Sequence, residues 1–346
     1  MTALKTFLTI LRIKIIINSS IAGIAPMDIH FYEAFAEEAE TLRHLLGSEY
    51  SYQTTDKTIQ ETGHTDPPAR LISIRTQSII PPEWGGIIDA VLSRSTGYDH
   101  LVKFKAQVST PVLLGYLNEY STRAVAEHAM MMVMALLRKL PQQIRQFPSF
   151  ERDGLTGIEC EGKKLLVVGV GRIGSEIVKV AKGLGFHVHG VDIVPDKADV
   201  KFVSKEEGIH WADVIVCSMN LTTENRAYFN HALLDAAKKG IMFVNIARGE
   251  LSPLHDLDRL LKEGHLAGLG LDVFEEESTL AVSLRNRKKG IPSTVELIDR
   301  LLSHSNVLLT PHNAFNSSEA LLRKSEMSVQ QIRHFFQKRD FLWKVR

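Results

Sequence analysis

Gly169-Val170-Gly171-Arg172-Ile173-Gly174 is a G-x-G-x-x-G motif near the middle of the chain. The preceding residues, Lys163–Val168, predict a buried parallel strand because they begin charged and continue apolar. The following residues, Ser175–Leu184, have the apolar spacing of a helix, and Gly185 is placed to end it. A strand, a glycine turn and a helix in this order indicate a dinucleotide-binding βαβ unit.

The glycines Gly169, Gly171 and Gly174 have separate expected roles. The first permits a tight turn, the second lets the backbone approach a pyrophosphate, and the third packs the helix against the strand. The phosphates would lie at the positive N-terminus of the helix. A second predicted strand, His187–Val191, ends in Asp192, about 20 residues further on, where a carboxylate can accept hydrogen bonds from an adenosine ribose. Asp192 argues against the alternative of a plain glycine turn in a βαβ unit.

The bulk composition favours an ordinary globular enzyme or binding protein. The 346 residues are enough for two domains. The 41 basic and 40 acidic residues give a formal net charge of +1, so neither nucleic acid nor a membrane surface is expected as a partner. The two cysteines, Cys160 and Cys217, are far apart and lack metal-ligand spacing. We therefore expect no metal site and a reducing, cytoplasmic compartment.

Residues 1–26 are interpreted as an N-terminal extension. They loosely resemble a secretory signal. Their apolar run, Phe7–Ile17, is interrupted by Arg12 and Lys14 and is too short to span a bilayer. The favoured reading is an upstream extension with no role in the fold, such as a mis-called start. Met27–Phe31 then predicts the first strand of the folded protein.

Strand and helix signals alternate on both sides of the glycine motif. The long segment Ser121–Leu140 is apolar on most sides, so we expect a helix that is buried nearly all round. Such a helix either crosses between domains or packs against another subunit. The alternation predicts an α/β protein of two Rossmann-like domains with doubly wound parallel sheets. Residues 27–118 and 311–346 are assigned to one domain built from both ends of the chain, and residues 119–310 to a Rossmann domain that binds a dinucleotide.

Three chemically useful side chains follow strands that come after the glycine motif. Arg248 follows the predicted strand Ile241–Asn245, the acidic run Asp272–Glu277 follows another strand, and His312 follows Val307–Leu309. Parallel strands end at one edge of a sheet, where ligands bind. An arginine, an acidic group and a histidine are therefore expected to converge near the nicotinamide.

Three segments resemble signatures of the D-isomer-specific 2-hydroxyacid dehydrogenase family: Asn245–Leu251, Leu271–Glu277 and Thr310–Phe315. Ser95–Asp99 and Ala124–Ala129 also resemble that family's pattern, and the resemblance extends from about Met27 to the end of the chain. It implies an NAD(H)-dependent enzyme, usually a homodimer, that interconverts a 2-keto acid and a D-2-hydroxy acid by hydride transfer. It also implies that residues 27–118 and 311–346 form a flavodoxin-like substrate domain and that residues 119–310 form the NAD-binding domain.

The resemblance implies that Arg248, Glu277 and His312 are catalytic. Arg248 has the rigid donor fork to hold a carboxylate beside a carbonyl. His312 is suited to donate a proton near neutral pH. Glu277, if paired with His312, would orient the ring and favour its protonated form. The choice of Glu277 rests on the family spacing Asp-Val-Phe-x-x-Glu, and the usual proline after it is Ser278 here. As alternatives, Arg248 could form a salt bridge at a helix start, His312 could be a structural residue after Pro311, and Glu277 could be a surface glutamate.

The remaining site residues are also carried over from the family. Arg172 and Ile173 are assigned to the pyrophosphate, and Ile246, Ala247 and Arg248 to the nicotinamide side. Further cofactor candidates are Met219, Asn225, His312 and Asp272, the last at the nicotinamide or in a hydrogen-bond network. NAD is favoured over NADP because Asp192 would repel a 2′-phosphate and Ile193-Val194 provide no arginine to bind one.

For the substrate, the backbone amides of Thr96 and Gly97 are expected to receive the carboxylate. Arg75 and Tyr120 are candidates to line the pocket, with surface or core roles as alternatives. The long stretch Ser278–Ser305 and the pair Ala314-Phe315 resemble the D-lactate dehydrogenase branch. Alternatives are a glyoxylate/hydroxypyruvate- or phosphoglycerate-type dehydrogenase, or an NAD-sensing, corepressor-like binding protein.

Overall fold

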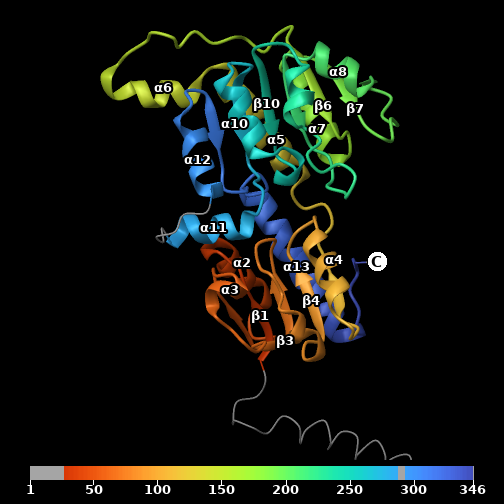
Figure 1. The fold of residues 1–346 in the computed structure, drawn as a ribbon. Coiled ribbons are helices and arrows are strands. Elements are labelled where there is room, and N and C mark those ends of the chain that lie inside the picture. The colour runs from red at the N-terminus through yellow and green to blue at the C-terminus, as the bar shows by residue number, and fades with distance from the viewer. Residues whose placement is uncertain (1–26, 287–292, 346) are drawn as a thin grey trace, which may run out of the picture. The chain divides into compact units, whose positions relative to one another are not determined.

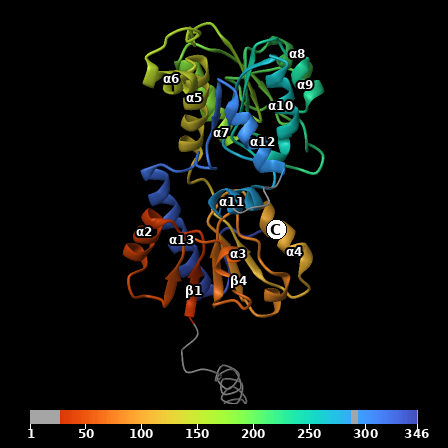
Figure 2. The same cartoon turned by 60° about the vertical axis from the view of Figure 1, so that its left-hand side comes forward.

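The computed structural model describes residues 27–286 and 293–345, so the predictions for residues 1–26 lie outside the described residues. The described chain forms two compact units (Figures 1 and 2). The first contains the residues up to Asn118 and those from Leu322 onward, and the second is Glu119–Leu321. Residues 311–321 therefore lie in the second unit, whereas the sequence interpretation places the boundary after residue 310.

The first unit is built on a parallel sheet with the strand order β2-β1-β3-β4-β5, which is the flavodoxin-like order. The strands are β1 (Met27–Phe31), β2 (Tyr52–Thr54), β3 (Ala69–Ile74), β4 (Ala90–Ser93) and β5 (Leu113–Gly115). The helices of this part of the chain are α2 (Ala36–Leu46), α3 (Ile59–Thr62), η1 (Pro82–Gly86), α4 (Asp99–Gln107) and most of α13 (Ser318–Lys338).

A buried ion cluster ties α13 to this sheet. Lys324 Nζ lies 2.9 Å from Glu38 Oε2, and Arg94 Nε donates to Glu38 Oε1 at 2.8 Å. The three side chains are almost completely buried. Burial by itself would raise the pKa of Glu38, but the charges of Arg94 and Lys324 lower it to about 2. The cluster therefore keeps a carboxylate ionised in the core, and removing one partner of such a cluster costs roughly 3–5 kcal/mol.

The second unit carries a parallel sheet with the strand order β12-β11-β10-β9-β6-β7-β8. The order reverses between β6 and β9, and a dinucleotide binds at this kind of switch point. The strands are β6 (Lys164–Val168), β7 (His187–Val191), β8 (Lys201–Phe202), β9 (Val214–Cys217), β10 (Ile241–Asn245), β11 (Leu266–Leu271) and β12 (Val307–Leu309). The predicted α/β class with two doubly wound parallel sheets is confirmed.

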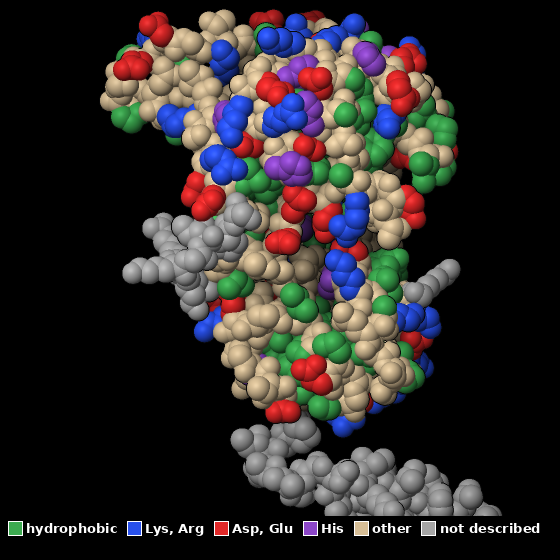
Figure 3. All heavy atoms as spheres, in the orientation of Figure 1, with side chains coloured by type: hydrophobic (Ala, Val, Ile, Leu, Met, Phe, Trp, Pro, Cys, Tyr) green, Lys and Arg blue, Asp and Glu red, His purple; other side chains and the backbone are tan. Residues whose placement is uncertain are grey.

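Helices cover both faces of the second sheet (Figure 1). They are α5 (Thr122–Leu137), α6 (Leu140–Gln146), η2 (Phe147–Ser149), α7 (Arg172–Gly183), α8 (Lys205–Trp211), α9 (His231–Asp235), η3 (Gly249–Leu251), α10 (Leu254–Lys262), α11 (Glu277–Asn286) and α12 (Ser293–Ser303). Within residues 27–286 and 293–345, no helix is long and apolar enough to cross a membrane. Basic and acidic side chains are interspersed over the face seen in Figure 3.

Helix α5 is less completely buried than its sequence predicts. It packs against α7 and against β10, β11 and β12, so it covers the sheet of its own unit. Met131 and Met134 remain 48% and 42% exposed, since they lie on the side away from that sheet. The helix ends at Leu137, shortly before Lys139, whose φ of 52° is left-handed.

Candidate active site

The glycine motif has the geometry that a pyrophosphate requires. Gly169 has a φ of +90°, and a Cβ there would lie 2.5 Å from the backbone of Met219. A Cβ on Gly174 would lie 2.1 Å from the carbonyl oxygen of Gly169, so only glycine allows this helix–turn packing. At Gly171 a Cβ would meet nothing within 4 Å, and no side chain caps the start of α7. The open turn and the uncapped helix N-terminus fit an anionic phosphate group.

Asp192 lies at the end of β7 and helps to shape this turn. Its Oδ2 accepts a hydrogen bond from Val170 N–H at 2.6 Å, and its Oδ1 accepts one from Val194 N–H at 2.9 Å. Each carboxylate oxygen has a further lone pair that can accept from a ribose hydroxyl. Ile193, directly after it, is 97% exposed and adds no cation to this edge.

The other cofactor candidates lie around the same switch point. Arg172 is the first residue of α7 and forms an ion pair with Glu119, and Ile173 follows it on the helix. Met219 follows β9 and packs against Gly169. Asn225 uses its side-chain amide within its own loop, because it accepts from Thr222 N–H at 2.7 Å and donates to the carbonyl oxygen of Asn220 at 2.7 Å.

Arg248 is held at the end of β10, after Ile246 and Ala247. The buried Asn245 side chain donates to the carbonyl oxygen of Arg248 at 2.8 Å and accepts from Ala247 N–H at 2.9 Å. Arg248 Nη1 donates to the carbonyl oxygen of Ala247 at 2.7 Å. A Cβ on Gly249 would lie 1.9 Å from the backbone carbon of Phe274, so a glycine is needed for this close approach. The approach brings the backbone next to Arg248 against the segment that leads to Glu277.

Glu277 and His312 form a pair. His312 Nδ1 lies 2.8 Å from each carboxylate oxygen of Glu277. Because an ionised carboxylate only accepts hydrogen bonds, Nδ1 carries the proton in this contact. His312 has a φ of 50°, and Glu276, directly before Glu277, has a φ of 49°. Left-handed backbone at residues other than glycine costs about 1–3 kcal/mol and is concentrated at functional sites.

Asp272 lies in a hydrogen-bond network, which is one of the two roles expected for it. Its side chain is buried, and its Oδ1 accepts from Thr310 Oγ1 at 2.5 Å and from Asn313 N–H at 2.8 Å. Its Oδ2 accepts from Ala314 N–H at 2.9 Å. Asp272 therefore holds the Thr310 side chain before His312 and the backbone N–H groups of Asn313 and Ala314 after it. Thr310 was overlooked as a site residue, although its place in the Thr-Pro-His-Asn segment was a signal for it.

Three substrate candidates belong to the first unit. Thr96 and Gly97 follow β4, and Ser95 Oγ shapes their loop by donating to the carbonyl oxygen of Gly97 at 2.7 Å. Arg75 follows β3, and its guanidinium carbon lies 5.6 Å from the ring centre of Phe35. In the second unit, the buried Tyr120 packs edge-on against Phe315, which corresponds to the core alternative.

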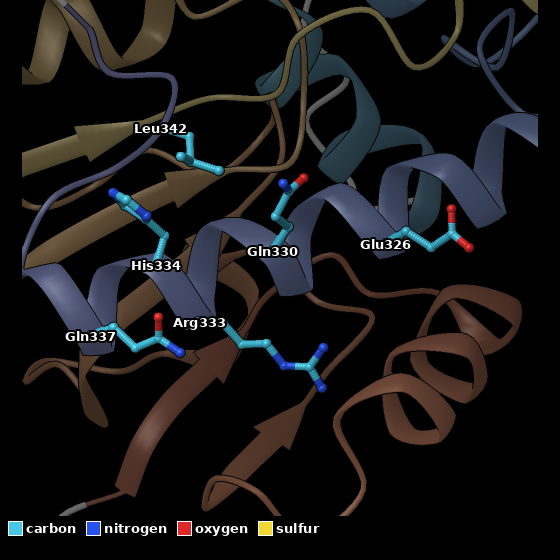
Figure 4. A pocket seen from close by; sticks show the side chains of 6 residues that line it. All are labelled: Glu326, Gln330, Arg333, His334, Gln337 and Leu342. Carbon is cyan, nitrogen blue, oxygen red and sulfur yellow. The ribbon is translucent and has the colours of Figure 1, made fainter.

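Two other features of the described residues involve none of the predicted site residues. A depression beside α13 is lined by Leu342 and by five polar or charged side chains (Figure 4), of which Arg333 already donates to Glu49 at 2.9 Å. On the second unit, ligand atoms of His231, Asp235 and Glu263 lie within 4.8 Å of one another. Arg259 Nε donates to Glu263 at 2.7 Å, which makes this group an ion-paired surface cluster.

Comparison with known proteins gives consistent matches. Residues 130–314 match the family model for "D-isomer specific 2-hydroxyacid dehydrogenase, NAD binding domain". A "2-hydroxyacid dehydrogenase homolog" of Zymomonas mobilis is 32% identical over 253 residues, which cover 71% of this chain and 75% of that protein. A D-lactate dehydrogenase of Escherichia coli is 33% identical over 219 residues, which cover 62% of this chain and 66% of that protein.

A solved structure extends the likeness over almost the whole chain. The D-lactate dehydrogenase of Aquifex aeolicus, complexed with NAD and lactic acid, is 26% identical with a TM-score of 0.79. The match covers 91% of this chain and 99% of that one. A match over 91% of the chain includes parts of both units, and residues 130–314, which match the family model, contain the glycine motif, Glu277 and His312.

Proposed function

The chain belongs to the family of D-isomer specific 2-hydroxyacid dehydrogenases, and from this premise we propose that it reduces a small 2-keto acid of the pyruvate type. It is an NAD-dependent oxidoreductase that interconverts 2-keto acids and D-2-hydroxy acids. The pyruvate-type substrate is proposed from the likeness to D-lactate dehydrogenases, and the proton donor is proposed from the Glu277–His312 pair, with Nδ1 2.8 Å from both carboxylate oxygens. This pair leaves the other ring nitrogen of His312, Nε2, as the proton donor to the substrate.

The cofactor, when bound, supplies the hydride that reduces the carbonyl carbon. In our proposal the glycine turn and the N-terminus of α7 hold its pyrophosphate, and Asp192 accepts the hydrogen bonds of its ribose. Ile246, Ala247 and Met219 lie on the nicotinamide side, where strands β10 and β9 end. These groups bind and orient the cofactor, and the proton comes from the protein.

His312 and Arg248 divide the work on the keto acid. As negative charge develops on the carbonyl oxygen, His312 gives it the Nε2 proton, and Glu277 stabilises the ring orientation through Nδ1. Arg248 binds the carboxylate next to the carbonyl with two parallel N–H donors. We propose that the backbone N–H groups of Thr96 and Gly97 bind the same carboxylate. The carboxylate is thereby fixed while the neighbouring carbon reacts.

A panel of 2-keto acids tests the substrate proposal. Pyruvate, a branched aliphatic keto acid, phenylpyruvate, glyoxylate, hydroxypyruvate and 3-phosphohydroxypyruvate are each incubated with the enzyme and NADH, and kcat/KM is measured. We expect pyruvate or the branched keto acid to have the highest value. A preference for glyoxylate, hydroxypyruvate or the phosphorylated acid would replace the proposal with one of those dehydrogenase types. NAD binding without turnover of any acid would favour the nucleotide-sensing alternative.

We propose that the preference for NAD over NADP depends on the carboxylate of Asp192. In Asp192→Asn the negative charge that opposes a 2′-phosphate is lost, together with part of the charge-assisted hydrogen bonding to the ribose. The ratio of kcat/KM for NADH to that for NADPH is expected to fall about 10- to 100-fold. Steady-state kinetics with both cofactors measure it, and a melting curve checks that the bond to Val170 N–H is not needed for folding. An unchanged ratio would contradict the assignment of Asp192.

We also propose a homodimer that pairs through α5, α6 and the turn that follows them. Helix α6 stands out at the edge of the second unit (Figures 1 and 2). Its Ile144 is 65% exposed, and Phe147 and Phe150 are 72% and 69% exposed. Other exposed apolar residues of this region are Met131, Met134, Leu140 and Ile158. An apolar surface of this kind on a soluble protein indicates a protein partner, and a second copy provides a matching apolar surface.

Light scattering after size-exclusion chromatography tests the dimer. The wild type is expected at twice the chain mass of 38.7 kDa, and the double variant Ile144→Asp/Phe147→Asp at the chain mass. Ile79→Asp, at an apolar residue of the first unit that is 57% exposed, is the matched control and should remain dimeric. A monomeric wild type would overturn the proposal.

We further propose a cytoplasmic location, which the free Cys160 and Cys217 support and which cell fractionation tests.

A further inference from the structure

A hydrogen-bond chain runs from helix α5 to the segment that carries His312. His128 Nε2 lies 3.1 Å from Thr310 Oγ1 and 3.7 Å from Asp272 Oδ1. Thr310 Oγ1 donates its proton to Asp272 Oδ1 at 2.5 Å. His128 thus stands at the far end of the network that holds residues 310–314, and it is assigned no role in the proposed mechanism.

The number of protons available determines which group donates in each of these hydrogen bonds. A threonine hydroxyl has one proton, and here Asp272 accepts it. The contact between His128 and Thr310 is a hydrogen bond only if His128 Nε2–H donates to the hydroxyl oxygen. Burial lowers the pKa of His128 below its ordinary value, against the opposing effect of the Asp272 charge. A neutral imidazole with its proton on Nε2 meets both conditions.

The packing of α5 on β11 explains why a histidine lies at this point. His128, Met132 and Leu136 are four residues apart, so they share one stripe of the helix. A Cβ on Gly270 would stand 3.4 Å from Met132 Cβ, and a Cβ on Gly268 would stand 3.4 Å from Leu136 Cβ. Asp272 comes two residues after Gly270, directly after the end of β11, and His128 comes four residues before Met132 on α5. The same stripe of the helix therefore brings His128 close to Asp272. The glycines on β11 therefore let α5 lie close enough for His128 to reach the network.

We propose that His128 is a positioning residue for the proton donor His312. Its Nε2–H orients the Thr310 hydroxyl toward Asp272, and Asp272 in turn holds the backbone N–H groups of Asn313 and Ala314. This support matters because His312 has a φ of 50°, which must be maintained by the surrounding hydrogen bonds. The inference rests on the proposed role of His312 in keto-acid reduction.

A double-mutant cycle tests the inference on the full-length enzyme. His128→Leu removes the donor, Thr310→Val removes the hydroxyl that receives it, and the double variant removes both. Each single variant is expected to lower kcat for the best keto acid about tenfold, with the Kd for NADH within about twofold of the wild type. The double variant should lose no more than the single ones, because both act through one hydrogen bond. His128→Gln can donate from its amide and should recover most of kcat.

Controls separate this inference from the proposed function. His255→Leu, at an exposed histidine on α10, should have the kcat of the wild type, and melting curves should show every variant to be folded. If the wild type reduces keto acids while His128→Leu keeps its full kcat, the inference is wrong and the proposed function stands. Multiplicative losses in the double variant, or no recovery in His128→Gln, would also overturn it. A wild type without turnover would overturn the proposed function itself.

Discussion

Replacing His312 with alanine is expected to lower kcat for keto-acid reduction by about 10²- to 10⁴-fold, the usual contribution of a general acid. The imidazole is the group that delivers the proton to the carbonyl oxygen, and water is a poorer and less well-placed donor. The Kd for NADH should change little, because the cofactor is held mainly by the glycine turn and Asp192. Steady-state kinetics and fluorescence titration with NADH measure the two quantities.

The matched control for this prediction is His255→Ala, at a histidine that is 75% exposed on α10. It should have the turnover of the wild type. Turnover close to the wild-type value in His312→Ala would remove His312 from the role of proton donor. A loss of NADH binding in that variant would show that its effect is structural.

Replacing Arg248 with glutamine is expected to lower kcat/KM for the keto acid by about 10²- to 10⁴-fold, mainly through KM. The variant loses two charge-assisted hydrogen bonds to the substrate carboxylate, each of which contributes roughly 1.5–3 kcal/mol. Arg248→Lys should recover only part of the loss, because an ammonium group lacks the planar pair of donors. Kinetics over a range of keto-acid concentrations separate kcat from KM.

A neutral substrate analogue provides the control for Arg248. The amide or methyl ester of the same 2-keto acid has no carboxylate for Arg248 to bind, so wild type and Arg248→Gln should reduce it at similar rates. If Arg248→Gln is equally impaired toward the analogue, Arg248 does not act through the carboxylate. Such a result would point instead to its bond with the carbonyl oxygen of Ala247.

Most of the fold could be predicted because its signals are local. The predicted strands His187–Val191, Ile241–Asn245 and Val307–Leu309 coincide with β7, β10 and β12. Helix α7 begins at Arg172, inside the glycine motif, since Gly171 serves as its N-cap. Helices α11 and α12 were not predicted, although Val295, Ile298 and Leu301 of α12 have helical spacing and are buried.

The site was predictable only to the extent that strand ends determine it. Strands β10, β11 and β12 are neighbours in the sheet, so Arg248 and the segments of Glu277 and His312 lie at one sheet edge. The sequence predicted this shared edge because parallel strands end on the same side of a sheet. The support around them depends on three-dimensional contacts. His128 reaches Asp272 only because Gly268 and Gly270 allow α5 to lie close to β11. No spacing in the sequence specifies that register.

The central claim is that a proton from His312 and a hydride from NADH together produce a D-2-hydroxy acid. A single-turnover experiment tests it most directly: the preformed complex with NADH is mixed with the best keto acid, NADH decay is followed, and the product is resolved on a chiral column. The account predicts one D-2-hydroxy acid per NADH consumed in the wild type, and decay at least about 10²-fold slower in His312→Ala. An L-product, or equal decay in the two proteins, would contradict it.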